Sequence, residues 1–283
     1  MVPQRQMFPA PRENVDGGDV KPAQRYLFIC GCARSGTSAL WQLMSSHPGI
    51  VLGLERYVRS RKKFSPLLFE KEAFFDVPLE NKSRKLQKYY REAQNRFDRA
   101  KFVGDKIPKL YLDYGRIEET FPNADIIFVL RNIIDVAGSY ERRRQDPEDS
   151  WSRDFRVSLH QWQESIDSTL SFLAKGSRTV SIHVVGYEDL WLEPVDIESL
   201  FGRLDLSLTP AVKQTYDFLT KQSKQLEAAR GDSLTSSARH YIALNAPFES
   251  YRELFKSRVV FPGSEERSQM NNTFDKDASA SET

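Results

Sequence analysis

The stretch from residue 26 to residue 40, YLFICGCARSGTSAL, constrains the fold more than any other part of this sequence. An apolar run is followed by a loop of small residues and then by a helical pattern, which predicts a strand, a tight turn and a helix. Gly31 and Gly36 bracket the turn, and the hydroxyls of Thr37 and Ser38 follow it directly. Because backbone N–H groups at such a helix N-terminus bind oxyanions, we expect a phosphate or sulfate there. The alternative is a plain strand-to-helix turn in which glycine only permits a tight backbone.

The loop differs from the P-loop of nucleotide triphosphatases at one decisive position. The lysine that directly follows the second glycine in a P-loop is replaced by Thr37, and the nearest cation is Arg34, inside the loop. This replacement disfavours a kinase that uses ATP and Mg²⁺.

Apolar runs alternate with helical patterns along the chain, at 26–30, 101–103, 125–130 and 180–185. The alternation predicts an α/β fold of three layers, with a central parallel sheet flanked by helices. The clearest helix carries one apolar stripe, made of Trp151, Phe155, Leu159, Trp162, Ile166, Leu170 and Leu173. A weaker stripe runs from Leu86 to Phe97, and Thr209 and Pro210 predict the start of a further helix. We expect flexible tails at 1–24 and 263–283, and one domain at 25–262.

The formal net charge of the 283 residues is only +2, but it is unevenly distributed. Between Glu55 and Lys101 there are 14 Lys and Arg against 7 Asp and Glu. Such a segment is compatible with an acidic ligand, with peripheral contact to an anionic membrane surface, or with a solvated helical face. No motif typical of nucleic-acid binding accompanies it, so we expect no nucleic-acid partner.

The two cysteines, Cys30 and Cys32, are too close together for an ordinary disulfide and too few for a zinc site. We expect two small buried thiols. The sequence contains no apolar run of the roughly 18 to 20 residues that span a membrane, and its first 24 residues do not resemble a signal peptide. These features predict a cytoplasmic protein.

A second group of polar residues follows the run at 125–130. Arg131 comes directly after that run, and Ser139 lies two helical turns further along. Because ligands of open α/β sheets bind at the carboxyl edge of the strands, Arg131 and the glycine loop are expected to face one crevice. An arginine offers a planar fork that suits a phosphate. The alternative is a structural ion pair between Arg131 and Asp135.

The two groups together resemble the sulfotransferases that use 3′-phosphoadenosine 5′-phosphosulfate (PAPS), and Tyr187-Glu-Asp-Leu190 is similar to the family's Y-E-D-L. The resemblance implies that Arg131 and Ser139 bind the 3′-phosphate of this donor. It also implies that the loop holds the 5′-phosphosulfate, through Cys32, Ala33, Arg34, Ser35, Gly36, Thr37 and Ser38.

An arginine in the loop is similar to the carbohydrate and tyrosylprotein branches of that family. In the tyrosylprotein branch a glutamate at the position of Glu55 looks like the catalytic base, although Leu54 and Tyr57 depart from that motif. Lys106, followed by Ile107 and Pro108, is similar to the lysine beside the donor sulfate.

Each of these assignments has an alternative. Asp105 is the reserve candidate for the base, or a local cap or ion pair. Glu55 is equally compatible with a surface ion pair to Arg56 or Arg59, and Lys106 with a solvated lysine.

The resemblance thus implies sulfuryl transfer to a hydroxyl of a saccharide, a glycolipid or a small metabolite, with residues 53–100 on the acceptor side. The cations Arg34 and Lys106 would stabilise the leaving group together with the helix N-terminus, so no metal is expected. Two alternatives stay open, an ATP-dependent small-molecule kinase and a catalytically silent nucleotide-binding module. The sequence leaves the oligomeric state undetermined.

Overall fold

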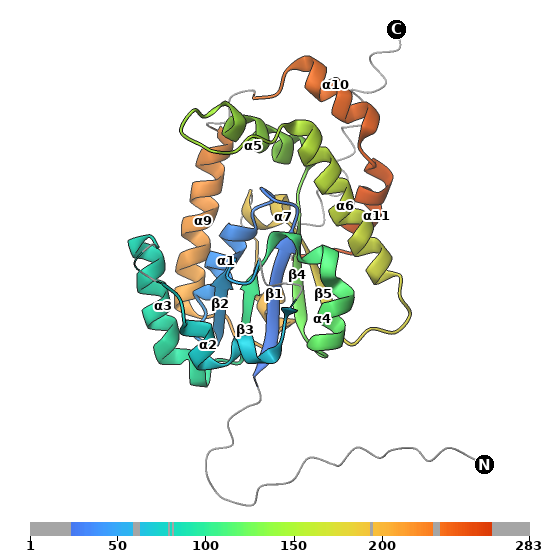
Figure 1. Ribbon diagram of the computed structural model, residues 1–283. Coiled ribbons are helices and arrows are strands. Elements are labelled where there is room, and N and C mark those ends of the chain that lie inside the picture. The colour runs from blue at the N-terminus through green and yellow to red at the C-terminus, as the bar shows by residue number, and fades with distance from the viewer. Residues whose placement is uncertain are drawn as a thin grey trace, which may run out of the picture.

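A five-stranded sheet forms the centre of the protein in the computed structural model, which describes residues 24–58, 63–78, 80, 82–192, 195–228 and 233–261. The strand order is β2-β3-β1-β4-β5, and every neighbouring pair is parallel (Figure 1). The strands are β1 (Arg25–Gly31), β2 (Ile50–Leu54), β3 (Phe102–Lys106), β4 (Asp125–Leu130) and β5 (Ser181–Gly186). The predicted α/β fold with a central parallel sheet is therefore confirmed.

Four of these strands were expected from apolar runs, and the fifth, β2, was not. The predicted run at 125–130 coincides with β4, and the other three predictions overlap their strands with shifted ends. β2 has only five residues, one of them Gly53, and it begins five residues after a helix. Such a short run with an internal glycine carries a weak strand signal.

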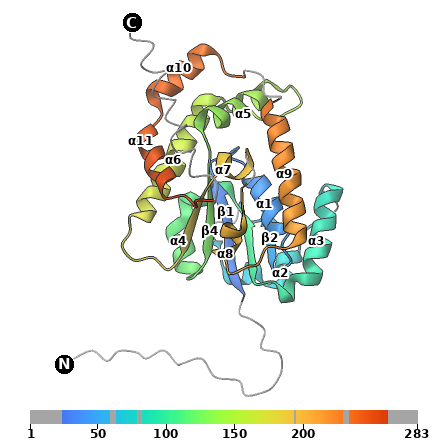
Figure 2. The same cartoon turned by 180° about the vertical axis from the view of Figure 1, so that it is seen from behind.

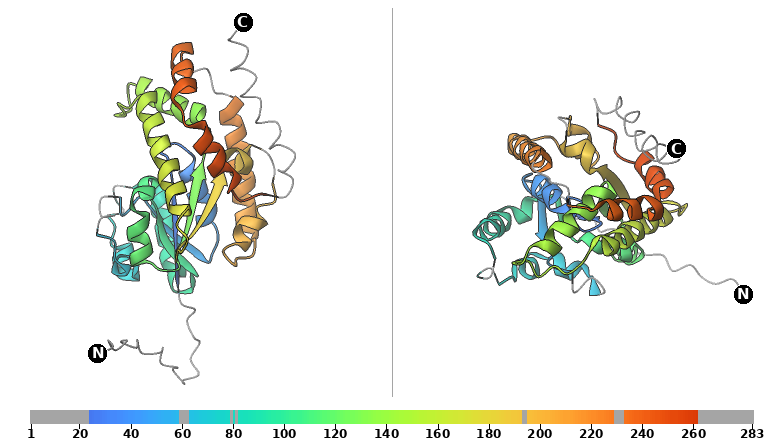
Figure 3. Two further views of the ribbon diagram at one scale, coloured as in Figure 1. Left: turned by 90° about the vertical axis from the view of Figure 1, so that its right-hand side faces the viewer. Right: turned by 90° about the horizontal axis from the view of Figure 1, so that it is seen from above.

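Helices cover both faces of the sheet, as the views from behind and from the side show (Figures 2 and 3). The core on one face includes Leu27 and Ile29 of β1, and the core on the other includes Phe28 and Cys30. The first face packs against α1 (Thr37–Ser45), α7 (Tyr187–Trp191), α8 (Glu198–Gly202) and α9 (Pro210–Ala228). The second packs against η5 (Pro108–Asp113), α4 (Tyr114–Thr120), α6 (Phe155–Leu173) and α11 (Phe248–Lys256).

The remaining helices lie beside β2 or beyond the ends of the strands. α2 (Lys71–Phe75) and α3 (Arg84–Arg96) lie on the β2 side of the sheet in Figure 1, and η2 (Pro66–Phe69) and η4 (Phe97–Arg99) contribute Phe69 and Phe97 to the core of the second face. The helices α5 (Ile133–Gln145) and α10 (Ser236–Asn245) lie beyond the carboxyl ends of the strands, at the top of Figure 1. The carboxyl edge is thus covered by helices that arise far apart in the sequence.

The predicted amphipathic helix is α6, and its stripe packs into the core. Leu159, Trp162 and Ile166 are buried, as predicted, and Trp162 donates from its indole nitrogen to the carbonyl of Arg131 at 2.8 Å. The carboxylate of Asp154 accepts from two backbone N–H groups and caps the helix, so Trp151 lies before it rather than within it. The helix α9 begins at Pro210, as predicted.

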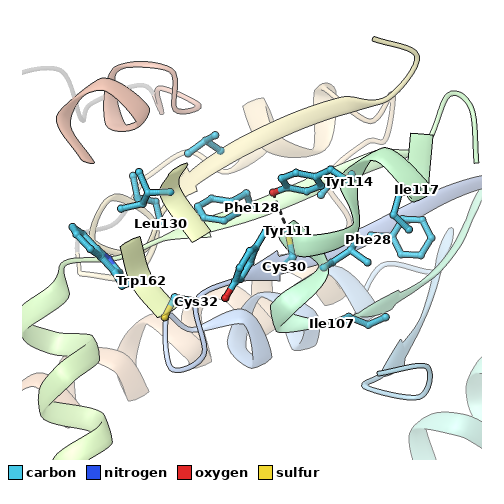
Figure 4. Close-up of a cluster of buried hydrophobic side chains, with 14 of the residues drawn as sticks. Phe28, Cys30, Cys32, Ile107, Tyr111, Tyr114, Ile117, Phe128, Leu130 and Trp162 are labelled. Carbon is cyan, nitrogen blue, oxygen red and sulfur yellow. Dashed lines mark hydrogen bonds between the residues drawn. The ribbon is translucent and has the colours of Figure 1, made fainter. Parts of the chain in front are cut away.

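Both cysteines are unpaired and buried, as predicted, beneath the second face of the sheet (Figure 4). The thiol of Cys30 lies 3.5 Å from the hydroxyl of Tyr114, and burial raises the pKa of both thiols to about 12. Since the thiolate is the reactive form, these cysteines are packing residues.

The two predicted tails lie outside the described residues, apart from Gln24. Within the described part of the chain, no helix combines the length and the apolar character needed to cross a membrane.

Candidate functional site

The glycine loop leaves β1 with a backbone that only a few residue types tolerate. Gly31 and Gly36 have φ angles of 147° and 94°, and Arg34 has a φ of 71°. A Cβ added to Gly31 would lie 2.5 Å from the carbonyl oxygen of Val129, and one added to Gly36 would lie 2.4 Å from the ring of Tyr187. The two glycines are therefore needed for both conformation and space.

The structure brings the loop together with the second predicted group. Arg34 donates from Nε to the hydroxyl of Ser139 at 3.0 Å, and Arg131 donates from Nη1 to the carbonyl of Arg34 at 3.3 Å. Arg131 follows β4 directly, and Ser139 lies on α5. Because β1 and β4 are adjacent parallel strands, their carboxyl ends bring these residues to the same place.

The guanidinium of Arg131 is buried but incompletely hydrogen-bonded. It lies over the ring of Tyr187, with Cζ 3.7 Å from the ring centre. Its Nη2 is 3.8 Å from the carboxylate of Asp135, so the ion pair considered as the alternative is long and makes no hydrogen bond. Among the described residues, neither Nε nor Nη2 has a hydrogen-bond partner. Buried donors without partners point to a polar ligand.

Arginines crowd this region. Partial burial lowers the pKa of Arg34, and the charges of Arg143, Arg131 and Arg142 lower it further. Clustered cations repel one another unless an anion lies between them, so the electrostatics favour an anionic ligand.

A pocket of about 400 Å³ opens among these residues. The predicted residues Arg34, Gly36, Thr37, Ser38, Arg131 and Ser139 line it. Cys32, Ala33 and Ser35, which were also predicted, do not. Cys32 is buried in the core, and the buried hydroxyl of Ser35 has no hydrogen-bond partner in the described part of the chain.

Several lining residues were not predicted from the sequence. They are Ala39, Arg142, Tyr187, Gln222, Ser223 and Leu226. The tyrosine belongs to the Y-E-D-L segment, which was recognised but not assigned to the site. The residues of α9 carry no local signal, since they reach the pocket only through the packing of α9 on α1.

The carboxylate of Glu188, next to Tyr187, contacts the backbone that directly follows Arg131. It accepts the backbone N–H of Asn132, the residue after Arg131, at 3.0 Å. Burial raises the pKa of Glu188 to about 7, although the N–H of Asn132 and the charge of Arg131 lower it.

Glu55 and Lys106 form an ion pair at the same edge of the sheet. Lys106 ends β3 and Glu55 follows β2, and these two strands pair with Leu54 opposite Lys106. The ammonium of Lys106 donates to Oε1 of Glu55. The side chain of Lys106 is 2% exposed and that of Glu55 is 48% exposed, so the carboxylate faces outward from a buried cation.

Two of the alternatives weighed for these residues, a solvated Lys106 and a pair between Glu55 and Arg56, do not match the geometry. Lys106 is not solvated, and Arg56 donates to the carbonyls of Ala73 and Asp76 instead of to Glu55. Arg59 lies outside the described residues. Neither Glu55 nor Lys106 lines the 400 Å³ pocket.

Within the described residues, no cluster of three or more His, Cys, Asp or Glu side chains could hold a metal ion.

A sequence model described as the Sulfotransferase family matches residues 27–210. No curated protein matches the sequence at a significant level.

Among solved structures, the chain is similar to the sulfotransferase domain of the curacin biosynthetic pathway, with 18% identity and a TM-score of 0.48 over 89% of this chain and 98% of that one. The sulfotransferase domain of the Synechococcus PCC 7002 olefin synthase has 17% identity and a TM-score of 0.46, over 87% of this chain and 99% of its own. Mouse sulfotransferase SULT7A1, complexed with PAP, has 15% identity and a TM-score of 0.43, over 75% of this chain and 72% of its own.

Proposed function

The chain belongs to the Sulfotransferase family, and on that premise we propose that it transfers a sulfuryl group from PAPS to an acceptor hydroxyl. The observation that carries the proposal is the meeting of two anion-binding groups in one pocket. The glycine loop and the Arg131–Ser139 pair come from different strands and are joined by the hydrogen bond from Arg34 to Ser139. A donor with two separated anionic groups requires two such centres.

The pocket fits this donor in three respects. Two buried donor atoms of Arg131 have no partner among the described residues. The N-terminus of α1 opens onto the pocket at Thr37 and Ser38, and the surrounding arginines supply positive charge. We assign the 5′-phosphosulfate to the loop and to the start of α1. The 3′-phosphate is assigned to Arg131 and Ser139.

Sulfuryl transfer needs an acceptor oxygen that loses its proton and a leaving phosphate that gains charge. In our proposal the hydroxyl proton moves to the carboxylate of Glu55, the bond from sulfur to the acceptor oxygen forms, and the bond from sulfur to the phosphate oxygen breaks. Arg34 and Lys106 stabilise the negative charge that develops on the leaving group. Lys106 contacts Glu55 directly, so one buried cation also orients the base.

We propose an acceptor that is a saccharide, a glycolipid or a small metabolite, bound beside residues 53–100. Lys82, Arg84 and Arg91 are exposed there, and none of them has an ion-pair partner within the described residues. These charges favour an acceptor with acidic character. The Lys and Arg side chains of residues 53–100 are also the basis for the proposed peripheral contact with a membrane. The two unpaired thiols support a reducing, cytoplasmic location.

Ligand-induced thermal stabilisation tests the donor assignment. A ligand that binds only the folded protein raises the melting temperature, so adenosine 3′,5′-bisphosphate is compared with ATP and Mg²⁺. We expect the bisphosphate to stabilise the protein more strongly. A preference for ATP and Mg²⁺ would instead support the kinase alternative and reject the proposal.

The acceptor is found by incubating the protein with sulfate-labelled donor and a panel of saccharides, glycolipids and hydroxylated metabolites. Transfer to at least one class is expected. Stabilisation by the bisphosphate without transfer to any acceptor would favour the silent nucleotide-binding module.

A further inference from the structure

Asp105 is a fully buried carboxylate to which the proposed donor site assigns no role. It lies in β3 next to Lys106, and its side chain is 0% exposed. Successive residues of a strand point to opposite faces, so Asp105 and Lys106 point away from each other. Its reserve assignment as the base stays a prediction, while the contacts of its carboxylate point to another role.

The carboxylate of Asp105 holds the turn that carries Glu55. Its Oδ2 accepts the backbone N–H of Tyr57 at 2.9 Å. Its Oδ1 lies so close to Gly53 that a Cβ added there would be 2.7 Å away. Gly53 and Tyr57, two positions before and two positions after Glu55, therefore both contact one side chain.

The turn at Glu55 has an unfavourable backbone conformation that needs such support. Glu55 has a φ of 56°, in the left-handed region that non-glycine residues rarely adopt. Its N–H donates to the carbonyl of Lys106 at 3.0 Å. Residues held in this region persist only where the surrounding structure determines them, and they cluster at functional sites.

Further hydrogen bonds join the same turn to the segment at 68–76. The guanidinium of Arg56 donates to the carbonyls of Ala73 and Asp76, and the hydroxyl of Tyr57 donates to the carbonyl of Leu68. These hydrogen bonds tie residues 56 and 57 to the segment at 68–76. From β3, the carbonyl of Lys106 accepts the N–H of Glu55 and the carboxylate of Asp105 accepts the N–H of Tyr57, so Asp105 supplies the side-chain contact.

We propose that Asp105 is a positioning residue, which locks the turn at residues 55–57 so that the carboxylate of Glu55 lies on the ammonium of Lys106. The proposal rests on the function proposed above only for the chemical role of Glu55. The contact between Asp105 and the turn is independent of that role.

The test replaces Asp105 by Ala and by Asn and measures turnover with labelled donor. Asp105→Ala removes the acceptor of the Tyr57 N–H, so we expect turnover to fall at least tenfold. Asp105→Asn keeps an oxygen in place and should recover most of that loss. Stabilisation by adenosine 3′,5′-bisphosphate should be the same in both variants as in the parent, because Asp105 does not line the donor pocket.

A matched control is available at the other end of the sheet. Asp125 is also a buried strand carboxylate, 2% exposed, and it pairs with Arg25 at 2.6 Å and His183 at 2.9 Å. Asp125→Asn should lower the melting temperature and leave turnover unchanged. An equal loss of turnover in this variant would show that any damage to a buried carboxylate is sufficient, and would overturn the proposal.

A double-mutant cycle shows whether Asp105 acts through Glu55. In a Glu55→Gln background, Asp105→Ala should cause less than a further twofold loss of turnover. A further loss as large as in the parent protein would mean that Asp105 acts independently, which contradicts a positioning role.

Amide hydrogen exchange separates this proposal from the proposed function. Asp105→Ala should accelerate exchange at the amides of Glu55 and Tyr57 at least tenfold relative to the amides of β1, and Asp125→Asn should not. Unchanged exchange in Asp105→Ala would overturn the proposal even in an active enzyme. If the parent protein transferred no sulfate, the proposed function would fail. Faster exchange of the Glu55 and Tyr57 amides in Asp105→Ala would still show that Asp105 fixes the turn. If Asp105→Ala does not fold, Asp105→Ser replaces it in all of these measurements.

Discussion

The guanidinium of Arg131 lies over the ring of Tyr187, with Cζ 3.7 Å from the ring centre. Arg131 follows β4 and Tyr187 follows β5, while the same ring occupies the space that a side chain at Gly36 would need. The tyrosine therefore links the glycine loop to Arg131. Among the described residues, Nε and Nη2 of Arg131 have no hydrogen-bond partner, so in the proposed function these are the groups that bind the anion.

Arg131→Ala should weaken binding of adenosine 3′,5′-bisphosphate by roughly 10- to 100-fold, since a hydrogen bond to a charged group is worth about 1.5–3 kcal/mol. Adenosine 5′-phosphate lacks the 3′-phosphate, so its affinity should change much less. Isothermal titration calorimetry with both ligands measures the difference. Arg91→Ala, at an exposed position of α3, is the control and should change neither affinity. Equal losses for both ligands would contradict the assignment of Arg131 to the 3′-phosphate.

Gly36→Ala should abolish stabilisation by adenosine 3′,5′-bisphosphate and lower the melting temperature. The new Cβ would lie 2.4 Å from the Tyr187 ring at a residue whose φ is 94°, so either the ring or the loop must move. Gly115→Ala is the matched control, because nothing lies within 4 Å of its added Cβ. That variant should bind the bisphosphate normally and gain up to about 1 kcal/mol from helix propensity. Normal ligand binding by Gly36→Ala would refute the close packing of the loop on Tyr187.

Glu55→Gln and Lys106→Ala should each lower turnover at least tenfold, which is the general magnitude of a lost general base or a lost electrostatic contact. Stabilisation by the bisphosphate should persist in Glu55→Gln, since this residue does not line the donor pocket. Steady-state rates with labelled donor provide the measurement, and Glu119→Gln, at an exposed position of α4, is the control. Activity near that of the parent in either variant would remove that residue from the proposed mechanism.

Glu188→Gln should change how stability depends on pH. Burial raises the pKa of Glu188 to about 7 from the usual 4.5, so the folded protein holds this proton more tightly than the unfolded chain. The contribution of this proton to the free energy of unfolding is complete below about pH 4.5 and is lost as the pH rises through about 7. The melting temperature of the parent should therefore fall relative to that of Glu188→Gln between these two values. Parallel curves for the two proteins would show that the buried carboxylate does not titrate in this range.

Chelators should leave the rate of sulfuryl transfer unchanged. In the proposed mechanism Arg34 and Lys106 stabilise the charge on the leaving group, so no divalent cation is needed for that step. Rates measured with and without EDTA, after dialysis, test this expectation. A loss of activity that Mg²⁺ restores would require a revised mechanism.

Much of the architecture was predictable because strands and turns leave local signals. The run at 125–130 is apolar throughout and became β4, and the helical stripe from Phe155 to Leu173 became α6. β2 was missed because its five residues include Gly53 and lack a distinctive pattern. A buried edge strand of this kind is defined by its pairing with β3, which is a contact between residues about 50 positions apart.

Some residues of the candidate site were also predictable from the sequence, and others were not. Arg34, Arg131 and Ser139 stood out because each belongs to a short motif at the end of an apolar run. Glu55 and Lys106 were selected separately by resemblance, and only the register of β2 on β3 placed them in contact. The α9 residues Gln222 and Ser223 were not foreseen.

The sequence by itself determined a glycine loop after the first strand, a second polar group after a later strand, and the α/β fold that joins them. These are properties of short segments, set by backbone sterics and by the spacing of apolar side chains. The tertiary structure alone decided that Arg131 lies over Tyr187, that α9 completes the pocket beside the glycine loop and that Asp105 accepts the N–H of Tyr57. Those contacts depend on the order and register of parallel strands, and no local pattern encodes which strand ends become neighbours.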